Sequence, residues 1–369
     1  MGSFQRLIIL VCVLLLVPGL AFEVKPEGEI VHTSEVFAII LGDGEVYTVG
    51  GNGRLRVLDT NDHAQLSSVP ITNGWSSALA ESGGDIFIGN DDGTIAVVDR
   101  RDLVERSRLS LGAPVHSVFA DAKVVVGATE GGPVVVFDAV TLAERGRLFG
   151  EAFFHGAVAD DRFIYAGGGG NPCGAYDPPG GLTIWERDDL AQVTRIPTSS
   201  FIWTVAVDGS RILTGAQDGW LRVFDRTTFG RRDLIDMGSA IYSLLVDPRY
   251  VYVGMKDGRV SVLDRATLEE RATLRAGSAI WALATDGARL YTGGEDGVMR
   301  TWDIGSILRT SDLLGSSALF TPASAQTLEP GIVTLPRPRS REPVRVSPVS
   351  WLWRMTSTER PGVTLMTFG

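Results

Sequence analysis

Short alternating hydrophobic and polar segments run along most of the chain, separated by glycine-containing turns. In one clear unit, residues 280–284 lead to a turn at Asp286-Gly287, and residues 289–293 lead to a second turn at Asp296-Gly297. A third segment then ends at Trp302-Asp303. Each segment has the length and alternation of a strand with one buried face. The unit therefore predicts three antiparallel strands joined by tight turns.

The same unit recurs at nearly constant spacing. Its third segment closes on an acidic residue seven times, at Asp59, Asp99, Asp138, Glu186, Asp225, Asp264 and Asp303. These closing acids are 40, 39, 48, 39, 39 and 39 residues apart. A period near 40 is typical of a four-stranded propeller blade, and seven units make a closed ring. We therefore predict an all-β chain, a seven-bladed β-propeller of four-stranded antiparallel blades.

Turn residues support this interpretation. Five of the seven second turns carry Asn-Gly or Asp-Gly, at residues 52–53, 92–93, 218–219, 257–258 and 296–297. These residues reach positive φ at little cost in a tight hairpin. A fourth, outer strand follows each closing acid, as in residues 264–274, and we interpret its Arg and Glu residues as solvated edge charges that discourage strand addition.

Two segments compete for the outer strand of the last blade. One is Glu29 to His32, before the first unit, and the other is Ser311 to Leu314, after the last. Pairing the start of the chain with its last unit lets the ring latch on itself and removes two sheet edges. We therefore favour the N-terminal segment.

Composition changes this picture mainly at the ends. Arg6, an apolar run over residues 7–17 and Gly19-Leu20-Ala21 form the pattern of a secretory signal. We expect cleavage after Ala21, with an uncleaved anchor as the alternative, and a secreted or extracytoplasmic protein. Residues 22–314 would form the ring. Cys173 would then be the one remaining cysteine, so the ring would have no internal disulfide.

Residues 315–369 break the repeat and carry seven of the 17 prolines. This composition predicts an extended, flexible tail. The tail has six Arg and three acids, whereas the whole chain has a net charge of -10. We therefore expect possible intramolecular contact of the tail with the acidic ring. Trp351, Leu352 and Trp353 are apolar and would seek a partner or a blade. The acidic balance gives no electrostatic footprint for nucleic acid.

Over residues 30–314 the repeats resemble those of the WD-repeat family of β-propellers. The resemblance rests on the period and on phrases such as Asp218-Gly219 running to Asp225, with the namesake dipeptide at Trp302-Asp303. No repeat has the family's Gly-His pair, and quinoprotein-like propellers are the nearest neighbours. The resemblance implies a platform that binds other proteins.

The resemblance also implies a candidate site at the mouth of the central channel. The equivalent positions lie 22 or 23 residues before the closing acid, ahead of a small and an aliphatic residue: Phe37, Ser76, His116, Trp203, Tyr242 and Trp281, with His155 in the fourth repeat. Aromatic rings there could bind a cationic side chain. In the alternative interpretation they fill the seams between blades. Because Asp218, Asp257 and Asp296 lie in neighbouring turns, we expect a basic partner, the chain's own tail among the candidates.

The fourth repeat has about nine extra residues that enlarge its second turn over residues 167–180. We interpret this turn as either a tolerated insertion or a binding loop that includes Tyr176 and Asp177. A metal site at Cys173 is disfavoured because no second Cys or His lies at ligand spacing.

Catalytic motifs are lacking in the sequence. The four histidines are scattered, and the chain has neither a nucleophile elbow nor a phosphate loop. We therefore predict an exported, non-enzymatic protein-binding or assembly platform without a cofactor or metal. The alternatives are a quinoprotein-like propeller enzyme and a structural component of the cell envelope.

Overall fold

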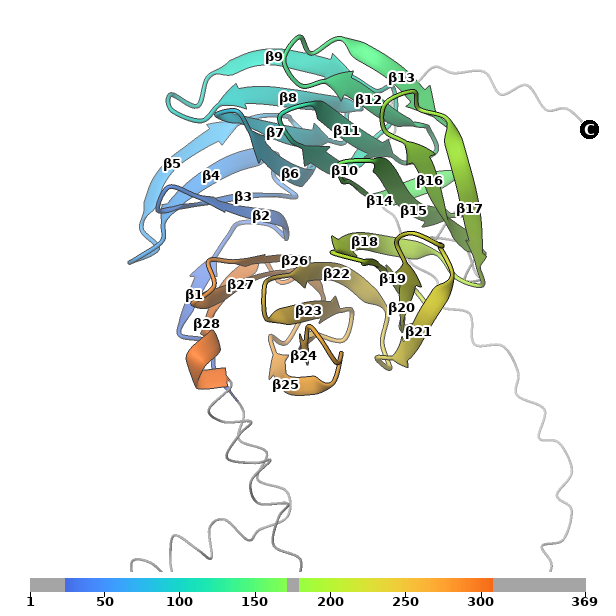
Figure 1. Cartoon of the computed structure of the whole chain (residues 1–369). Coiled ribbons are helices and arrows are strands. Elements are labelled where there is room, and N and C mark those ends of the chain that lie inside the picture. The colour runs from blue at the N-terminus through green and yellow to red at the C-terminus, as the bar shows by residue number, and fades with distance from the viewer. Residues whose placement is uncertain (1–23, 171–178, 308–369) are drawn as a thin grey trace, which may run out of the picture. The chain divides into compact units, whose positions relative to one another are not determined.

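The computed structural model of the 369-residue chain describes residues 24–170 and 179–307. Within these ranges the chain forms 28 strands in seven four-stranded antiparallel sheets arranged around a centre (Figure 1). The all-β propeller fold predicted from the repeat is therefore confirmed. The predicted signal segment and the predicted tail lie outside the described residues.

Each of the first six blades takes its strands from one stretch of sequence, with the first strand innermost. The strands of blades one to three are β2 (Val36–Gly42), β3 (Glu45–Gly50), β4 (Arg54–Asp59), β5 (Gln65–Pro70); β6 (Ser76–Ser82), β7 (Asp85–Asn90), β8 (Thr94–Asp99), β9 (Glu105–Ser110); β10 (Val115–Ala120), β11 (Val124–Thr129), β12 (Val134–Asp138) and β13 (Glu144–Leu148).

The strands of blades four to six are β14 (Phe153–Ala159), β15 (Phe163–Gly169), β16 (Gly180–Glu186), β17 (Gln192–Thr198); β18 (Ile202–Asp208), β19 (Arg211–Ala216), β20 (Trp220–Asp225), β21 (Arg231–Asp236); β22 (Ile241–Val246), β23 (Tyr250–Met255), β24 (Arg259–Asp264) and β25 (Glu270–Arg275).

The seventh blade joins the two ends of the described chain. It consists of β26 (Ile280–Thr285), β27 (Arg289–Gly294), β28 (Val298–Asp303) and, as its outer strand, β1 (Gly28–Val31). Ile30 lies opposite Met299, and the Arg300 Nε donates to the Glu29 carboxylate at 3.1 Å. The prediction that the N-terminal segment completes the last blade is confirmed, whereas Ser311 to Leu314 lie outside the described residues.

The core of the ring lies in the seams between blades. Each cluster of buried apolar side chains draws on two neighbouring sheets, such as Val124 and Val134 of blade three with Phe154 and Ile164 of blade four. The seam between blades seven and one is built in the same way, with Tyr291 packed in one cluster with Val36. Burying one such aliphatic side chain stabilises the fold by about 1.5–3 kcal/mol, so the seams hold the ring together.

The closing acids have a local structural role. The Asp264 Oδ1 accepts the backbone N–H groups of Ala266 and Thr267 at 2.9 and 3.0 Å, which fixes the turn into the outer strand. Four residues after the acid, Leu268 adopts a φ of 60°. Its side chain packs against a seam cluster, and this burial offsets the cost of a left-handed backbone at a residue with a Cβ. Equivalent turns follow Asp99, Asp138 and Asp225.

Second turns follow the sequence prediction. In the five turns with Asn-Gly or Asp-Gly, the glycine has a φ between 61° and 83°. At Gly219 an added Cβ would also lie 3.0 Å from the backbone of Ser239. Glycine is therefore required there both for backbone conformation and for space.

Candidate functional site

The candidate site lies where the seven inner strands begin. In each inner strand the pairing register shifts around a single residue, which leaves one residue per blade in a β-bulge. The seven bulge residues are Phe37, Ser77, His116, His155, Trp203, Tyr242 and Trp281. Six of the seven positions singled out in the sequence occupy this place.

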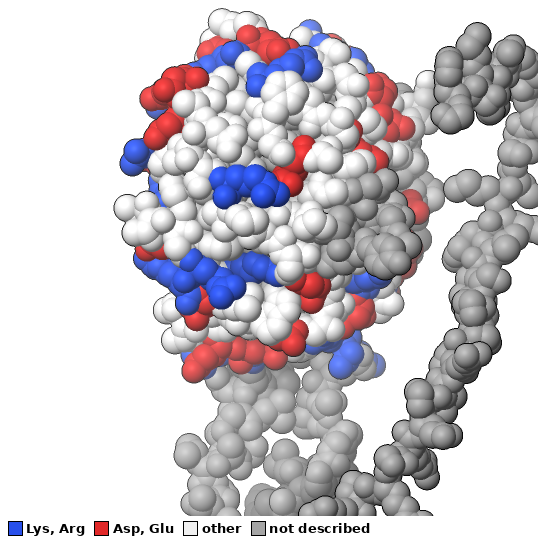
Figure 2. Space-filling view, turned by 90° about the vertical axis from the view of Figure 1, so that its right-hand side faces the viewer, with Lys and Arg blue, Asp and Glu red and all other residues white. Residues whose placement is uncertain are grey.

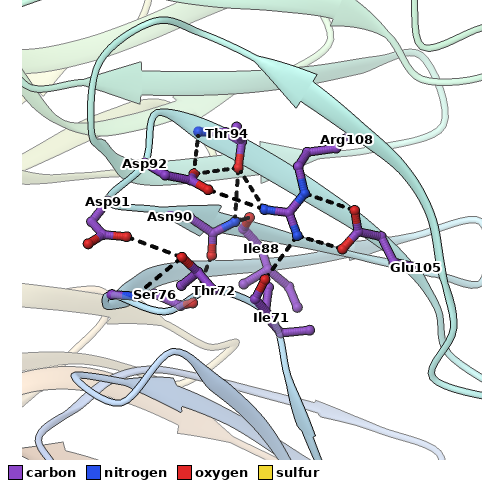
Figure 3. Close-up of polar contacts among 11 residues, drawn as sticks. Ile71, Thr72, Ser76, Ile88, Asn90, Asp91, Asp92, Thr94, Glu105 and Arg108 are labelled. Carbon is purple, nitrogen blue, oxygen red and sulfur yellow. Dashed lines mark hydrogen bonds and ion pairs between the residues drawn. The ribbon is translucent and has the colours of Figure 1, made fainter.

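The position chosen in the second blade is wrong by one residue. Ser76 is fully buried, and its hydroxyl donates to the Asn90 side chain at 2.7 Å (Figure 3). Ser77 occupies the bulge, and its hydroxyl donates to the Val115 carbonyl of the next blade at 2.5 Å. The aromatic ring of this blade comes instead from Trp75, just before the strand. Sequence reasoning missed Trp75 because it searched for one fixed offset.

These side chains form a closed circuit of rings, which we call the aromatic girdle: Phe37, Trp75, His116, His155, Trp203, Tyr242 and Trp281. Successive ring centroids around the circuit are 6.5, 5.3, 4.6, 4.6, 5.1, 4.3 and 6.1 Å apart. Such distances lie within or close to the range of favourable aromatic contacts. Each blade therefore contributes one ring to a continuous belt around the central axis.

Two parts of the girdle are stacked and the rest meet edge to face. Tyr242 and Trp281 are nearly parallel, with an interplanar angle of 8°. His116 lies between Trp75 and His155, at angles of 25° and 20°. A further contact joins Trp203 and Trp281 at 6.2 Å, so the belt is drawn inward on that side.

A cavity of about 500 Å³, which we call the chamber, opens at the girdle. Its wall is formed by the girdle and by the two residues that follow each bulge, one small and one aliphatic, such as Ala282 and Leu283. The small residue is needed because neighbouring inner strands approach closely. A Cβ on Gly156 would lie 2.8 Å from the Thr204 Cα.

Girdle rings remain partly accessible, unlike the tryptophans that fill the seams. Trp185 and Trp302 are 2% and 0% exposed, whereas all seven girdle residues are of intermediate exposure. The structure therefore places the predicted residues around the axis and in contact with one another, and other side chains fill the seams.

Most polar atoms of the girdle already have partners within the ring. The Trp203 Nε1 donates to the Gln217 side chain at 2.7 Å, and the His155 Nδ1 lies 3.0 Å from the Trp203 carbonyl, to which its protonated form donates. The His116 Nε2 lies 2.9 Å from Glu130. Among the described residues, the Trp281 Nε1 is buried without a hydrogen-bond partner. Such unsatisfied donors are rare and costly.

The surroundings of the girdle disfavour charge. Burial, and secondarily the neighbouring His116, lowers the pKa of His155 to about 3. Burial, followed by the charge of Glu295, raises the pKa of Tyr242 to about 12. Both shifts favour the neutral side chain at physiological pH, as expected where water is displaced by aromatic rings.

A rim of second-turn residues borders the girdle: Asp91, Glu130, Gln217, Lys256 and Glu295. Their backbone N–H groups donate to the carbonyls just before the inner strands, as Glu130 does to Pro114 at 2.8 Å. Within the described ranges Asp91, Glu130 and Glu295 form no ion pair with an arginine.

The aspartates expected to attract a basic partner are paired instead. Asp218 binds Arg222, Asp257 binds Arg259 and Asp296 binds Arg300, each within its own hairpin. The charge of these aspartates is therefore largely balanced. The acidic character of the rim comes from the acids one residue earlier in the turns or in other blades.

A second set of arginines escaped the sequence analysis. Arg265, which follows a closing acid, binds Asp208 of the preceding blade through its Nε at 2.6 Å. Asp208 is only 3% exposed and also binds Arg211. Interpreting Arg265 as a solvated edge charge was wrong. Similar pairs join Arg187 to Asp121 and Arg226 to Asp160, and an arginine directly after the closing acid is the signal that could have found them.

Other charged side chains fit the edge interpretation. Glu105 and Arg108 on β9 pair with each other, as do Glu144 and Arg147 on β13. On the side of the ring shown in Figure 2, the right-hand side of Figure 1, basic and acidic side chains are interspersed.

Three candidate residues of the enlarged turn, Cys173, Tyr176 and Asp177, lie outside the described residues. Across residues 24–170 and 179–307, no group of three or more His, Cys, Asp or Glu side chains is placed to hold a metal ion. No helix in this part of the chain is long and apolar enough to cross a membrane.

Comparison with known proteins gives one match. The family model for the WD domain, G-beta repeat, matches residues 268–303. This stretch begins near β25, the outer strand of blade six, and ends with β28, the third strand of blade seven. No curated protein matches the chain significantly. Together, the matched repeat and the ring of seven four-stranded blades make the chain a WD-repeat β-propeller, a fold that typically serves as a protein-interaction platform.

Proposed function

We propose that the chain is an exported, non-enzymatic platform that binds a partner protein on the face of the ring where the aromatic girdle opens. The closed girdle is the observation that carries this proposal. Each blade contributes one partly exposed ring, and these rings supply large, rigid contact area of the kind enriched at binding hot spots.

Export rests on the sequence. The apolar run over residues 7–17, followed by Gly19-Leu20-Ala21, is the pattern of a cleavable signal. Mature protein beginning near Phe22 in a secreted or periplasm-like fraction supports export. Full-length protein beginning at Met1 and confined to the cytoplasm contradicts it.

The rim supports a partner with basic character. Asp91, Glu130 and Glu295 are not neutralised by arginine, whereas Lys256 supplies the one basic side chain among the five rim residues. Rim charges act chiefly on the rate and salt dependence of association. The platform would therefore attract a basic surface by its rim and hold it by the girdle.

The test is affinity capture with the full-length chain and two tryptophan variants of the same blade. Trp203→Ala removes a girdle ring, whereas Trp220→Ala removes a half-buried tryptophan from the first position of β20. A protein captured by the unmodified chain and by Trp220→Ala, but not by Trp203→Ala, supports the proposal. Equal capture by all three contradicts it.

A charge variant separates rim from girdle. Glu130→Gln and Glu295→Gln together should slow association and flatten its salt dependence without abolishing capture, because rim charges steer rather than anchor. Glu144→Gln and Glu269→Gln, on outer parts of the ring, are the matched control. A partner whose association is unchanged by the rim variant is not recognised by its basic character.

A further inference from the structure

The chamber beneath the girdle differs chemically from the rim around it. Its lining contains no Asp, Glu, Lys or Arg among the described residues. Aliphatic side chains such as Leu79, Leu244 and Leu283 form the wall below the rings. A cation entering this space would lose its hydration without meeting a carboxylate, which is costly.

Hydroxyl groups in the wall are already engaged. The Ser117 Oγ donates to the Ala157 carbonyl at 3.3 Å, and the Ser243 Oγ donates to the Ile280 carbonyl at 3.0 Å. Each bond reaches the inner strand of the next blade. These residues therefore tie blades together and offer the chamber little unused hydrogen-bonding capacity.

The girdle presents few free ring faces to a cation. Tyr242 and Trp281 cover each other at 4.3 Å, and His116 is covered on both sides by Trp75 and His155. A cation–π site requires an accessible face within about 6 Å of the ring centroid. Stacked rings fill that space themselves. The neutral state of His155, favoured by its desolvation, agrees with an apolar environment.

Size indicates what can occupy the chamber. Its volume of about 500 Å³ lies within the range of small-molecule sites. At about 30 Å³ per water, this is room for roughly fifteen waters, more than a single side chain requires. Displacing water that finds few polar partners by an apolar group is favourable.

We infer that the chamber binds a small, uncharged, apolar molecule. This inference deepens the proposed function, because it rests on the girdle face being a binding site. Its test uses purified protein and no partner, so a negative result here is distinguishable from failure of partner capture.

The test is calorimetric titration of the full-length protein with three probes that share one ring system: naphthol, naphthylmethylammonium and naphthoate. We expect naphthol to bind at least about tenfold more tightly than either charged probe, since burying an unpaired charge costs more than one such factor. Equal or tighter binding of naphthylmethylammonium would overturn the inference in favour of a cation site.

A filled chamber gives the second arm. Leu244→Trp enlarges a wall residue and should weaken naphthol binding by about tenfold or more, whereas Leu234→Trp, on outer strand β21, should leave it unchanged. Naphthol binding that is insensitive to Leu244→Trp places the probe elsewhere. Naphthol binding that appears only after Trp351→Ala and Trp353→Ala shows that the chain's own tail is the occupant. Either result would overturn the inference.

Discussion

Tyr242 and Trp281 stack face to face with their ring centroids 4.3 Å apart and their planes 8° apart. They come from neighbouring blades, one bulge residue each. The contact is part of a circuit that passes through all seven blades, and it makes the girdle a product of ring closure. The stack also means that each ring can lose its partner without opening a seam.

Truncating a girdle tryptophan should cost little stability. Trp203→Ala and Trp281→Ala remove partly exposed rings with ring–ring contacts worth about 0.5–1.5 kcal/mol each, so we expect losses below about 2 kcal/mol. Trp302→Ala removes a fully buried indole that donates to Thr292 at 3.1 Å, and it should cost about 3–5 kcal/mol. Urea unfolding of the three variants checks this. Losses as large at Trp203 and Trp281 as at Trp302 would assign the girdle to seam packing.

Acid should destabilise the ring through His155. Its pKa is about 3 in the fold and about 6.5 when unfolded, so between these values the unfolded chain binds the proton and the folded chain does not. Stability is therefore lost as pH falls through this window, by about 2–3 kcal/mol at pH 4. His155→Asn should remove that part of the slope when unfolding is measured at pH 7 and pH 4. Identical slopes for both proteins would show that His155 is protonated in the fold.

The buried pair of blades five and six should matter more than its exposed counterpart. Asp208→Asn leaves Arg211 and Arg265 without their carboxylate and should cost about 2–4 kcal/mol. Asp161 is 84% exposed beside Arg226, and Asp161→Asn should cost less than about 1 kcal/mol. Chemical denaturation at pH 7 measures both. Equal costs would mean that burial of Asp208 adds nothing to the pair.

The same pair has a predictable pH dependence. Burial alone would raise the pKa of Asp208, but hydrogen bonds from Arg265 and Arg211 hold it below its usual range. A depressed carboxyl pKa stabilises the fold above the unfolded value near 3.9, and this contribution is lost as pH falls through the folded pKa. The cost of Asp208→Asn should therefore shrink in acid.

The N-terminal strand should stabilise the whole ring. Removing residues 22–33 deletes β1, exposes the edge of β28 and uncovers part of the cluster that joins blades seven and one. Because the blades unfold together, we expect the melting temperature to fall by about ten degrees or more. An unchanged melting temperature would mean that another segment takes the place of β1.

Sequence reasoning reached the ring because the closing acids mark a periodic local structure. Each acid fixes its own turn, so spacing alone gives the number of blades and the offset that aligns them. The same offset located the girdle in six blades. It failed at Ser76 because Trp75 reaches the girdle from outside the bulge, and that reach depends on tertiary packing.

Charge was harder to predict than topology. Asp296 and Arg300 lie four residues apart across one hairpin, and their pairing removes a charge that the sequence alone assigned to the binding face. Arg265 pairs with a residue 57 positions earlier, and this partnership exists only once blades five and six are side by side. Formal charges along a repeat therefore overstate the field that a partner would meet.

Hydrogen exchange of the full-length chain, free and bound to its captured partner, tests the binding face most directly. We predict slower exchange on binding at the starts of inner strands in several blades, including residues 114–118, 201–205, 240–244 and 279–283, with outer strands β9, β13, β21 and β25 unchanged. Slower exchange confined to those outer strands, with the girdle segments unaffected, would contradict the assignment of the girdle face as the binding surface.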